Sequence, residues 1–233
     1  MSIRRRSAMT GVSTETTEPE QAAMPALPAE KRRCPWPTAA AMAFCVLLVN
    51  CGAARPAKFY SLESPPTNVA PNNSPNSVTL LVGQITAPDI YRDERIVYSD
   101  GPVQLGAYES QRWAELPTEM VEGMLVDSLR ASGQYRVVER VSSNARGDYV
   151  VRGHLSALDE VDTPQLAARF SIELELFDRN AGTVVWMQTY AHDEPVSAKT
   201  VPAVVGALQT NVHAGLQQLT NSLGQYFASR PAH

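Results

Sequence analysis

The sequence predicts an α+β fold, a mostly antiparallel sheet with two long helices packed on one of its faces. Apolar and polar residues alternate strictly from Arg169 to Leu176, within the segment 166–177, which is typical of a strand with one face in a core and the other in water. In the segments 115–132 and 201–228, apolar residues recur instead at steps of three or four, which predicts amphipathic helices. The pattern leaves the order of the strands open.

Eight short segments have the composition of strands. Asp100-Gly101-Pro102 and Asp178–Gly182 predict two turns between them, because glycine adopts the backbone angles of tight turns and proline does not continue a ladder. Residues 64–77 hold four prolines and four asparagines. This connector is either a tether or, as we favour, a long loop between two strands of the domain. The predicted strands are 58–62, 78–85, 95–99, 103–108, 135–140, 149–158, 166–177 and 183–190.

The predicted helices show an amphipathic stripe, and the first also carries terminal signals. Glutamates crowd the first turns of 115–132, where they favour the helix dipole, and Pro117 falls in the first turn, where proline is tolerated. Gly133 stands where the C-terminal end of a helix is expected. The predicted buried stripes are Leu116, Met120, Val121, Met124, Leu125 and Leu129, and Val205, Leu208, Val212, Leu216, Leu219, Leu223 and Phe227.

Residues 1–50 are interpreted as an N-terminal extension and a secretory signal peptide that is removed. A basic cluster at 31–33 precedes twelve uncharged residues, 38–49. As a helix this run spans about 18 Å, too short for a ~30 Å hydrocarbon core. Cys51 follows Leu48-Val49-Asn50 and so resembles the acylated cysteine of a bacterial lipobox, although Asn50 stands where a small residue is usual. The alternative is a signal cut elsewhere, with Cys51 an ordinary thiol.

These features divide the chain into three parts. Residues 1–50 are removed, residues 51–77 hold the lipidated N-terminus, a short strand and the connector, and residues 78–233 form the folded domain. The strand at 58–62 is expected to join that domain. All three cysteines, Cys34, Cys45 and Cys51, lie in or beside the signal, so no disulfide and no cysteine metal site is expected in the domain.

Charge restricts the partners of the mature protein. Residues 51–233 hold 14 Lys and Arg against 20 Asp and Glu, a net charge of −6. Such a surface repels nucleic acid, so no nucleic-acid partner is expected. It also gives no attraction to anionic lipid, so acyl chains must supply a membrane anchor.

Residues with catalytic chemistry are scarce, and we predict that the chain is not an enzyme. The histidines, His154, His192, His213 and His233, are scattered and show no ligand spacing. Glu173 and Glu175 share one face of a strand and could couple as acid and base. Glutamates on the water-facing side of a strand are far more often solubilising. We therefore expect no catalytic residue, no cofactor and no metal.

The block from Ala87 to Trp113 is the candidate for a protein contact. It mixes aromatic, basic and acidic residues with little periodicity, and exposed Tyr, Trp and Arg together are typical of protein interfaces. The candidate contact residues are Tyr91, Arg92, Arg95, Tyr98 and Trp113. In the alternative interpretation the three rings only fix a loop onto the sheet, and Trp113, beside a helix start, is the stronger candidate for the core.

The same residues carry a resemblance to a known family. The lipobox cysteine is followed by Phe59-Tyr60-x-Leu62, by Pro-x-x-Tyr-x-x-x-x-Ile-Val-Tyr from Pro88 to Tyr98, and by Arg112-Trp113-Ala114-Glu115 opening a helix. This series resembles the ABC-type transport auxiliary lipoprotein family, from Cys51 to about Phe227. The middle motif is its most specific part.

The resemblance implies a non-catalytic envelope lipoprotein. Its partner would be an Mce-domain protein of an ABC transporter that moves phospholipid or other hydrophobic molecules between inner and outer membrane. Because Gly52, and not Asp, follows the cysteine, the implied location is the periplasmic face of the outer membrane. The alternative function is a periplasmic lipid-binding carrier, which needs a pocket between sheet and helices. Homo-oligomerisation is left open.

Overall fold

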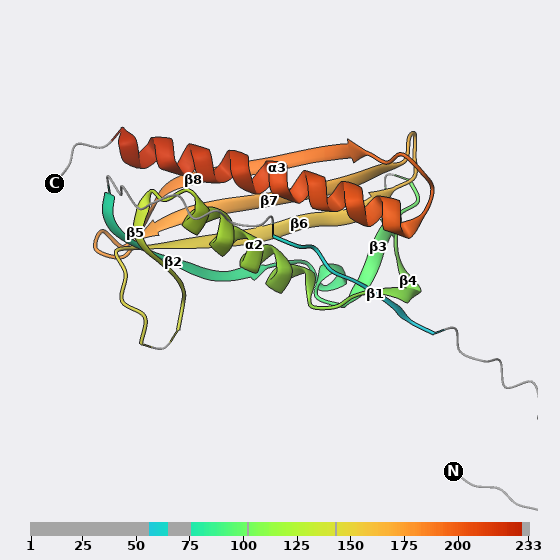
Figure 1. The fold of residues 1–233 in the computed structure, drawn as a ribbon, viewed down its shortest axis with the longest axis horizontal. Coiled ribbons are helices and arrows are strands. Elements are labelled where there is room, and N and C mark those ends of the chain that lie inside the picture. Colours follow the sequence, from blue (N-terminus) through green and yellow to red (C-terminus); the bar gives the residue numbers. More distant parts are fainter. Residues whose placement is uncertain (1–55, 65–75, 102, 143, 230–233) are drawn as a thin grey trace, which may run out of the picture. The chain divides into compact units, whose positions relative to one another are not determined.

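The structure, a computed structural model, describes residues 56–64, 76–101, 103–142 and 144–229. They belong to one compact unit, Ala54–His233. The strands are β1 Lys58–Tyr60, β2 Asn76–Thr86, β3 Arg95–Ser99, β4 Leu105–Trp113, β5 Tyr135–Arg140, β6 Tyr149–Val161, β7 Ala167–Asp178 and β8 Thr183–Pro195, and the helices are the 3-10 turn η1 Asp89–Tyr91, α2 Pro117–Ala131 and α3 Val201–Ala228. The predicted α+β class is confirmed (Figure 1).

One eight-stranded sheet is organised around β6. On one side, β6 pairs in parallel with β2 along its first half and with β3 along its second half. On its other side it pairs antiparallel with β7 over its whole length, and β7 pairs antiparallel with β8. Beyond β2 lies β5, and beyond β3 lie β4 and then β1. Most paired residues therefore belong to antiparallel ladders, and β8 forms one edge of the sheet.

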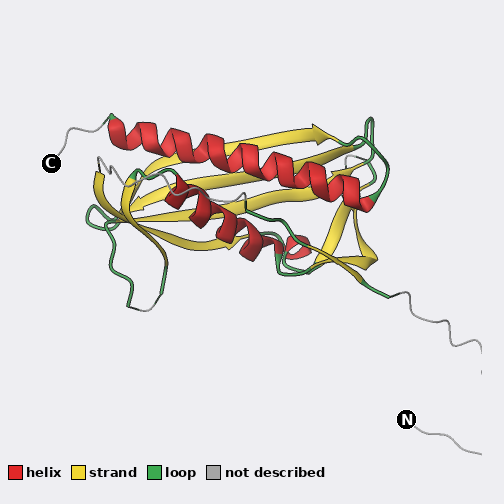
Figure 2. Ribbon diagram, viewed as in Figure 1, coloured by secondary structure: helices red, strands yellow, loops and turns green. Residues whose placement is uncertain are grey.

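Both long helices cover the same face of this sheet (Figure 2). Helix α3 packs on β7 and β8, helix α2 packs on β2 and β5, and the two helices touch each other. Thr200 caps α3 by accepting a hydrogen bond from the backbone N–H of Ala203. We call the opposite side of the sheet, which neither α2 nor α3 covers, the open face.

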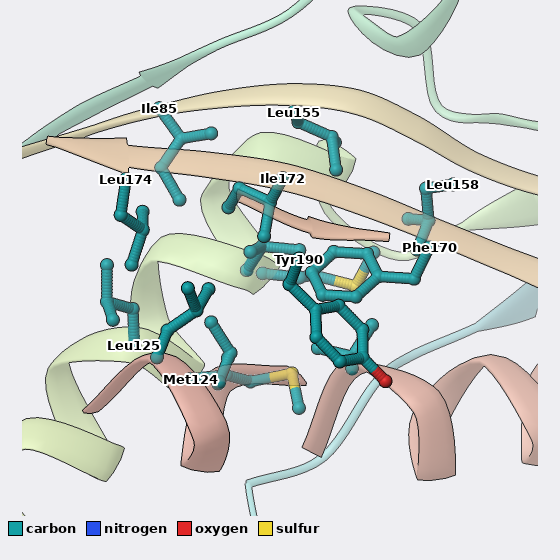
Figure 3. Packing of buried hydrophobic residues seen from close by; sticks show 14 of the residues in the cluster. Ile85, Met124, Leu125, Leu155, Leu158, Phe170, Ile172, Leu174 and Tyr190 are labelled. Atoms are coloured by element: carbon teal, nitrogen blue, oxygen red, sulfur yellow. The ribbon is translucent and has the colours of Figure 1, made fainter. Parts of the chain in front are cut away.

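The core fills the space between the helices and the sheet (Figure 3). Side chains of β6, β7 and β8 point towards Met124 and Leu125 of α2 and towards the buried stripe of α3. Both predicted helical stripes are buried except at Leu116, which is the N-cap residue of α2 and half-buried. The central sheet residues of this core are Leu155, Leu158, Phe170, Ile172, Leu174, Leu176 and Tyr190.

The N-terminal segment lies across the helical layer. β1 pairs with the end of β4, and Leu62 then enters the core. The Ser64 hydroxyl donates to the Asp127 carboxylate of α2 at 2.7 Å, and His213 Nε2 of α3 donates to the Glu63 carbonyl at 2.8 Å. Residues 58–64 therefore link the sheet edge to both helices. The rest of the predicted connector, residues 65–75, lies outside the described residues.

Three strands end three or more residues later than the sequence pattern predicts. β4 continues to Trp113 and does not end at Tyr108, because its polar second half is held between β1 and β3. β6 and β8 extend to Val161 and Pro195, because β7 pairs with both along its whole length. Where the alternation of side chains is weak, the end of a strand therefore depends on the neighbouring strands with which it pairs.

Candidate functional site

The turn η1, which is one part of the candidate contact block, folds onto the open face. β7 alternates faces, and Phe170 packs against Gly215 of α3, so Arg169 and its ladder partner Asp159 lie on the open face. The turn η1 covers Asp159, since the Tyr91 hydroxyl donates to Asp159 Oδ1 at 3.1 Å.

The expectation that Tyr91 is an exposed anchor was wrong. Only 4% of the Tyr91 surface is exposed, because η1 holds the ring against the sheet, where its hydroxyl donates to Asp159. Burial and the negative charge of Asp159 raise the pKa of Tyr91. The ring fixes the loop to the sheet, as the alternative interpretation predicted.

Asp159 accepts the hydrogen bond from Tyr91, and it was not among the site residues predicted from the sequence. It is 1% exposed, and its second oxygen, Oδ2, has no hydrogen-bond partner. Burial raises the pKa of Asp159 to about 6, although the positive charge of Arg169 and the hydrogen bond from Tyr91 oppose the rise. Arg169 itself donates to the Asp193 carboxylate of β8. The cluster is therefore a buried acid whose ionised form is only partly compensated.

Trp113 ends β4 and lies inside the domain. It is 1% exposed, one of the largest fully buried side chains, and its backbone N–H donates to the Glu94 carbonyl. Its place in the core agrees with the alternative interpretation, so Trp113 is no exposed contact residue.

Tyr98 lies on the other side of β3 from Arg95. The two residues are three apart on one strand, and a period of two puts them on opposite faces. The Tyr98 ring packs at a tilted angle against the Tyr108 ring, with 4.9 Å between centroids, and the Tyr108 hydroxyl donates to Glu160. Burial and the hydrogen bond to Glu160 raise the pKa of Tyr108. Gly106 makes room for this pair, because a Cβ there would lie 2.4 Å from the Tyr98 ring.

Of the candidate residues, only Arg92 and Arg95 remain close together at the surface: Arg92 is exposed in the loop after η1, and Arg95, which is half-buried, begins β3. Each has a local acidic partner, Asp89 at 2.9 Å from Arg92 and Asp93 at 2.9 Å from Arg95. The hydrogen bonds from Arg95 lower the pKa of Asp93. Exposed pairs of this kind contribute little to stability, so these arginines can exchange their partners for those of another protein.

The open face also holds a groove of about 640 Å³ that includes the predicted glutamate pair. Glu175 pairs with Arg152 at 3.3 Å, and Glu173 accepts a hydrogen bond from Thr189 at 3.3 Å. The Arg152 guanidinium lies over the Phe177 ring, 4.3 Å from its centroid. These contacts fit the solubilising role expected for the two glutamates.

The described residues also bear on metal binding and on membrane spans. Over the described ranges, no three His, Cys, Asp or Glu side chains gather as a metal site requires. In that part of the chain, no helix combines the length and hydropathy of a membrane span. The predicted acylation site, Cys51, lies outside the described residues.

Comparisons with known proteins identify the family. The family model of the ABC-type transport auxiliary lipoprotein component matches residues 60–221. The crystal structure of protein XCC0632 from Xanthomonas campestris has a TM-score of 0.66 at 24% identity, covering 75% of this chain and 100% of that one. The crystal structure of an uncharacterised protein has a TM-score of 0.56 at 18% identity, covering 74% of this chain and 99% of the other.

At these identities the two structures show a shared fold alone. No curated protein matches the chain. The family model, in contrast, runs from β1 into α3 and spans more than two thirds of the sequence. The chain belongs to the ABC-type transport auxiliary lipoprotein component family.

Proposed function

We propose that this protein is a non-catalytic, lipid-anchored auxiliary subunit of an Mce-type ABC transporter. It docks the transport machinery at the periplasmic face of the outer membrane, and the cargo is phospholipid or another hydrophobic molecule. Family membership supports the link to an ABC transporter. The filled interior is the single structural observation that favours docking over carrying cargo.

A carrier needs an enclosed apolar site, of about 300–1,000 Å³ for a small ligand. Here core side chains occupy the space between sheet and helices, and Leu62 adds to that packing from the N-terminal segment. Four grooves formed by described residues lie at the surface, on the open face and along the outer sides of α2 and α3. This arrangement supports a docking role.

The anchor in this proposal is Cys51. Six residues, 52–57, lie between it and Lys58, and a chain from position 51 to position 58 reaches at most about 25 Å. The β1 edge of the sheet is then held near the membrane. Each buried methylene of an acyl chain contributes ~0.8 kcal/mol, whereas the acidic domain has no attraction to anionic lipid.

A fractionation experiment tests the anchor. Cys51→Ser should move the protein from the membrane fraction to the soluble periplasm, while the matched change Cys45→Ser should leave it on the membrane. On a density gradient the unaltered protein should follow the outer membrane. A Cys51→Ser protein that stays on the membrane, or a mature mass without lipid, contradicts the proposal.

The docking surface in this proposal includes Arg92 in the loop after η1 and Arg95 at the start of β3. Truncating an anchor at an interface typically costs ~2 kcal/mol, roughly a thirtyfold loss in affinity. Arg92→Ala/Arg95→Ala should therefore lower the amount of Mce-domain protein that co-purifies from native membranes. Arg179→Ala, an exposed arginine of the β7–β8 hairpin, is the control and should not. Equal recovery of the Mce-domain protein with both variants would show that the two arginines are not part of the interface. Absence of an Mce-domain protein from every sample would contradict the proposed function.

A further inference from the structure

Phe59 is the exposed member of a sequence motif whose other residues are structural. In Phe59-Tyr60-x-Leu62, the Tyr60 hydroxyl donates to Gln111 Oε1 at 2.8 Å, and Leu62 lies in the core. The Phe59 residue, by contrast, is 61% exposed, so the packing of the domain gives no reason for an aromatic side chain there. A single exposed ring is common on protein surfaces, and its neighbours decide what it can bind.

Phe59 lies beside two arginines on the open face. Its ladder partner on β4 is Arg112, and the ladder partner of Arg112 on β3 is Arg95. The next pair along β1 and β4 is Tyr60 and Trp113, and Trp113 points into the core, so Phe59 and Arg112 point the opposite way. Figure 1 shows the three strands together at the end of the domain where α3 begins. We call Phe59, Arg112 and Arg95 the Phe59 row.

The two arginines of the Phe59 row are like charges on neighbouring strands. Ladder partners of the same charge destabilise a sheet. Arg95 has a close acidic neighbour, Asp93 at 2.9 Å, whereas the acid nearest to Arg112, Glu94, lies 3.9 Å away. A long ion pair between partly exposed side chains is weak. A carboxylate placed between the two guanidinium groups by another molecule would accept hydrogen bonds from both and would offset their repulsion.

We propose that the Phe59 row binds a segment of the partner protein that carries a carboxylate beside an apolar side chain. The apolar side chain covers the Phe59 ring, and the carboxylate accepts hydrogen bonds from Arg112 and Arg95. This proposal rests on the docking function proposed above. It supplies the exposed aromatic residue of that docking surface, a role that the buried rings of Tyr91 and Trp113 do not fill.

The distribution of charge favours an acidic segment as the occupant. Three basic residues, Arg92, Arg95 and Arg112, lie between Lys58 and Arg130 in the sequence. All three gather at this surface, since Arg95 and Arg112 are ladder partners and Arg92 precedes Arg95 by three residues. The mature chain as a whole has a net charge of −6, so an acidic partner is repelled from most other parts of it. Arginines around an aromatic ring are also typical of the centre of a protein interface.

Cross-linking in cells tests which molecule covers the ring. A photoreactive phenylalanine derivative replaces Phe59 in the whole chain, so that an aromatic side chain is kept at the surface. In the control the same derivative replaces Met187, which is 55% exposed on the edge strand β8. The probe at position 59 should capture the Mce-domain protein of the transporter through a peptide that contains Asp or Glu, and the probe at position 187 should not. Capture of phospholipid or of a second copy of this chain at position 59 overturns the proposal.

Substitutions test the contribution of each side chain. Phe59→Ala should lower the affinity for the captured protein about thirtyfold or more, measured by its recovery from native membranes, and Met187→Ala should leave the recovery unchanged. Because the ring is mostly exposed, Phe59→Ala should keep the melting temperature within about 2 °C. Arg112→Gln should also lower the recovery, and Arg112→Lys, which keeps the charge, should restore part of it.

The outcomes separate this proposal from the docking function on which it rests. If a probe at position 92 captures the transporter protein and the probe at position 59 does not, the Phe59 row is overturned and the docking function stands. If neither probe captures it, both are overturned. Full recovery of the partner with Phe59→Ala or with Arg112→Gln overturns the proposal. So does a Phe59→Ala protein that melts earlier but binds the partner normally per folded molecule, since the ring would then serve the fold alone.

Discussion

Replacing Asp159 by asparagine should stabilise the protein at neutral pH. The pKa of the buried carboxyl is raised from 3.8 to about 6, so the folded state holds the proton more tightly than the unfolded state does. The protonated Asp159 carboxyl makes its full contribution to the free energy of unfolding below pH 3.8, and this contribution is lost as the pH rises through about 6. Each pKa unit corresponds to about 1.4 kcal/mol, so the ionised carboxylate lowers the free energy of unfolding by about 3 kcal/mol at pH 7.5.

Asparagine keeps the acceptor for the Tyr91 hydroxyl and carries no charge. Asp159→Asn should therefore exceed the unaltered protein by about 3 kcal/mol in the free energy of unfolding at pH 7.5, a gain of roughly 6–12 °C in melting temperature. At pH 4 the carboxyl is mostly protonated, and the two proteins should differ by about 0.5 kcal/mol or less.

Urea denaturation at pH 4 and pH 7.5 measures both differences, and Tyr91→Phe supplies an independent comparison. Losing the donated hydrogen bond should raise the pKa of Asp159 further and cost about 1 kcal/mol at pH 7.5. The reasoning is refuted if Asp159→Asn is less stable than the unaltered protein at pH 7.5, or if its advantage is the same at both pH values. Either result would mean that Arg169 and Tyr91 compensate the buried charge in full.

Two further changes test the core. Trp113→Ala should cost about 3–5 kcal/mol in urea denaturation, because the ring is 1% exposed; a loss below 1 kcal/mol would place the ring at the surface. Gly215→Ala should cost about 1–3 kcal/mol, since its Cβ would lie 2.6 Å from the Tyr190 ring. The matched change Gly206→Ala in the same helix has no atom within 4 Å of its Cβ and should gain about 0.5–1 kcal/mol; equal effects at the two glycines would contradict the packing.

Much of the fold follows from the residue pattern. The bounds of α3, β3 and β5 agree with the predicted ones, because strong periodicity or turn residues mark their ends. The end of β4 was missed because Glu109–Trp113 has no apolar alternation, and its place in the sheet comes from pairing with distant β1 and β3. Strand order depends on such long-range ladders throughout.

The candidate site was predicted less well. An irregular segment does not show whether an aromatic ring such as Tyr91 faces a core or water. The separation of Tyr98 from Arg95 could have been predicted, since positions three apart on a strand lie on opposite faces. The position of Asp159 beneath Tyr91 could not have been predicted, because the irregularity between Leu155 and Ala157 shifts the alternation of β6 and changes which side chains face Tyr91.

In-cell photo-crosslinking tests the proposed docking most directly. A photoreactive amino acid replaces Arg92 in the exposed loop after η1, and Arg179 in the control, and the cross-linked proteins from whole cells are identified by mass spectrometry. We predict that the probe at position 92 captures the Mce-domain protein of an ABC transporter and that the probe at position 179 does not. Equal capture at both positions, or no transporter component at position 92 while the protein is correctly folded on the membrane, would contradict the proposed docking.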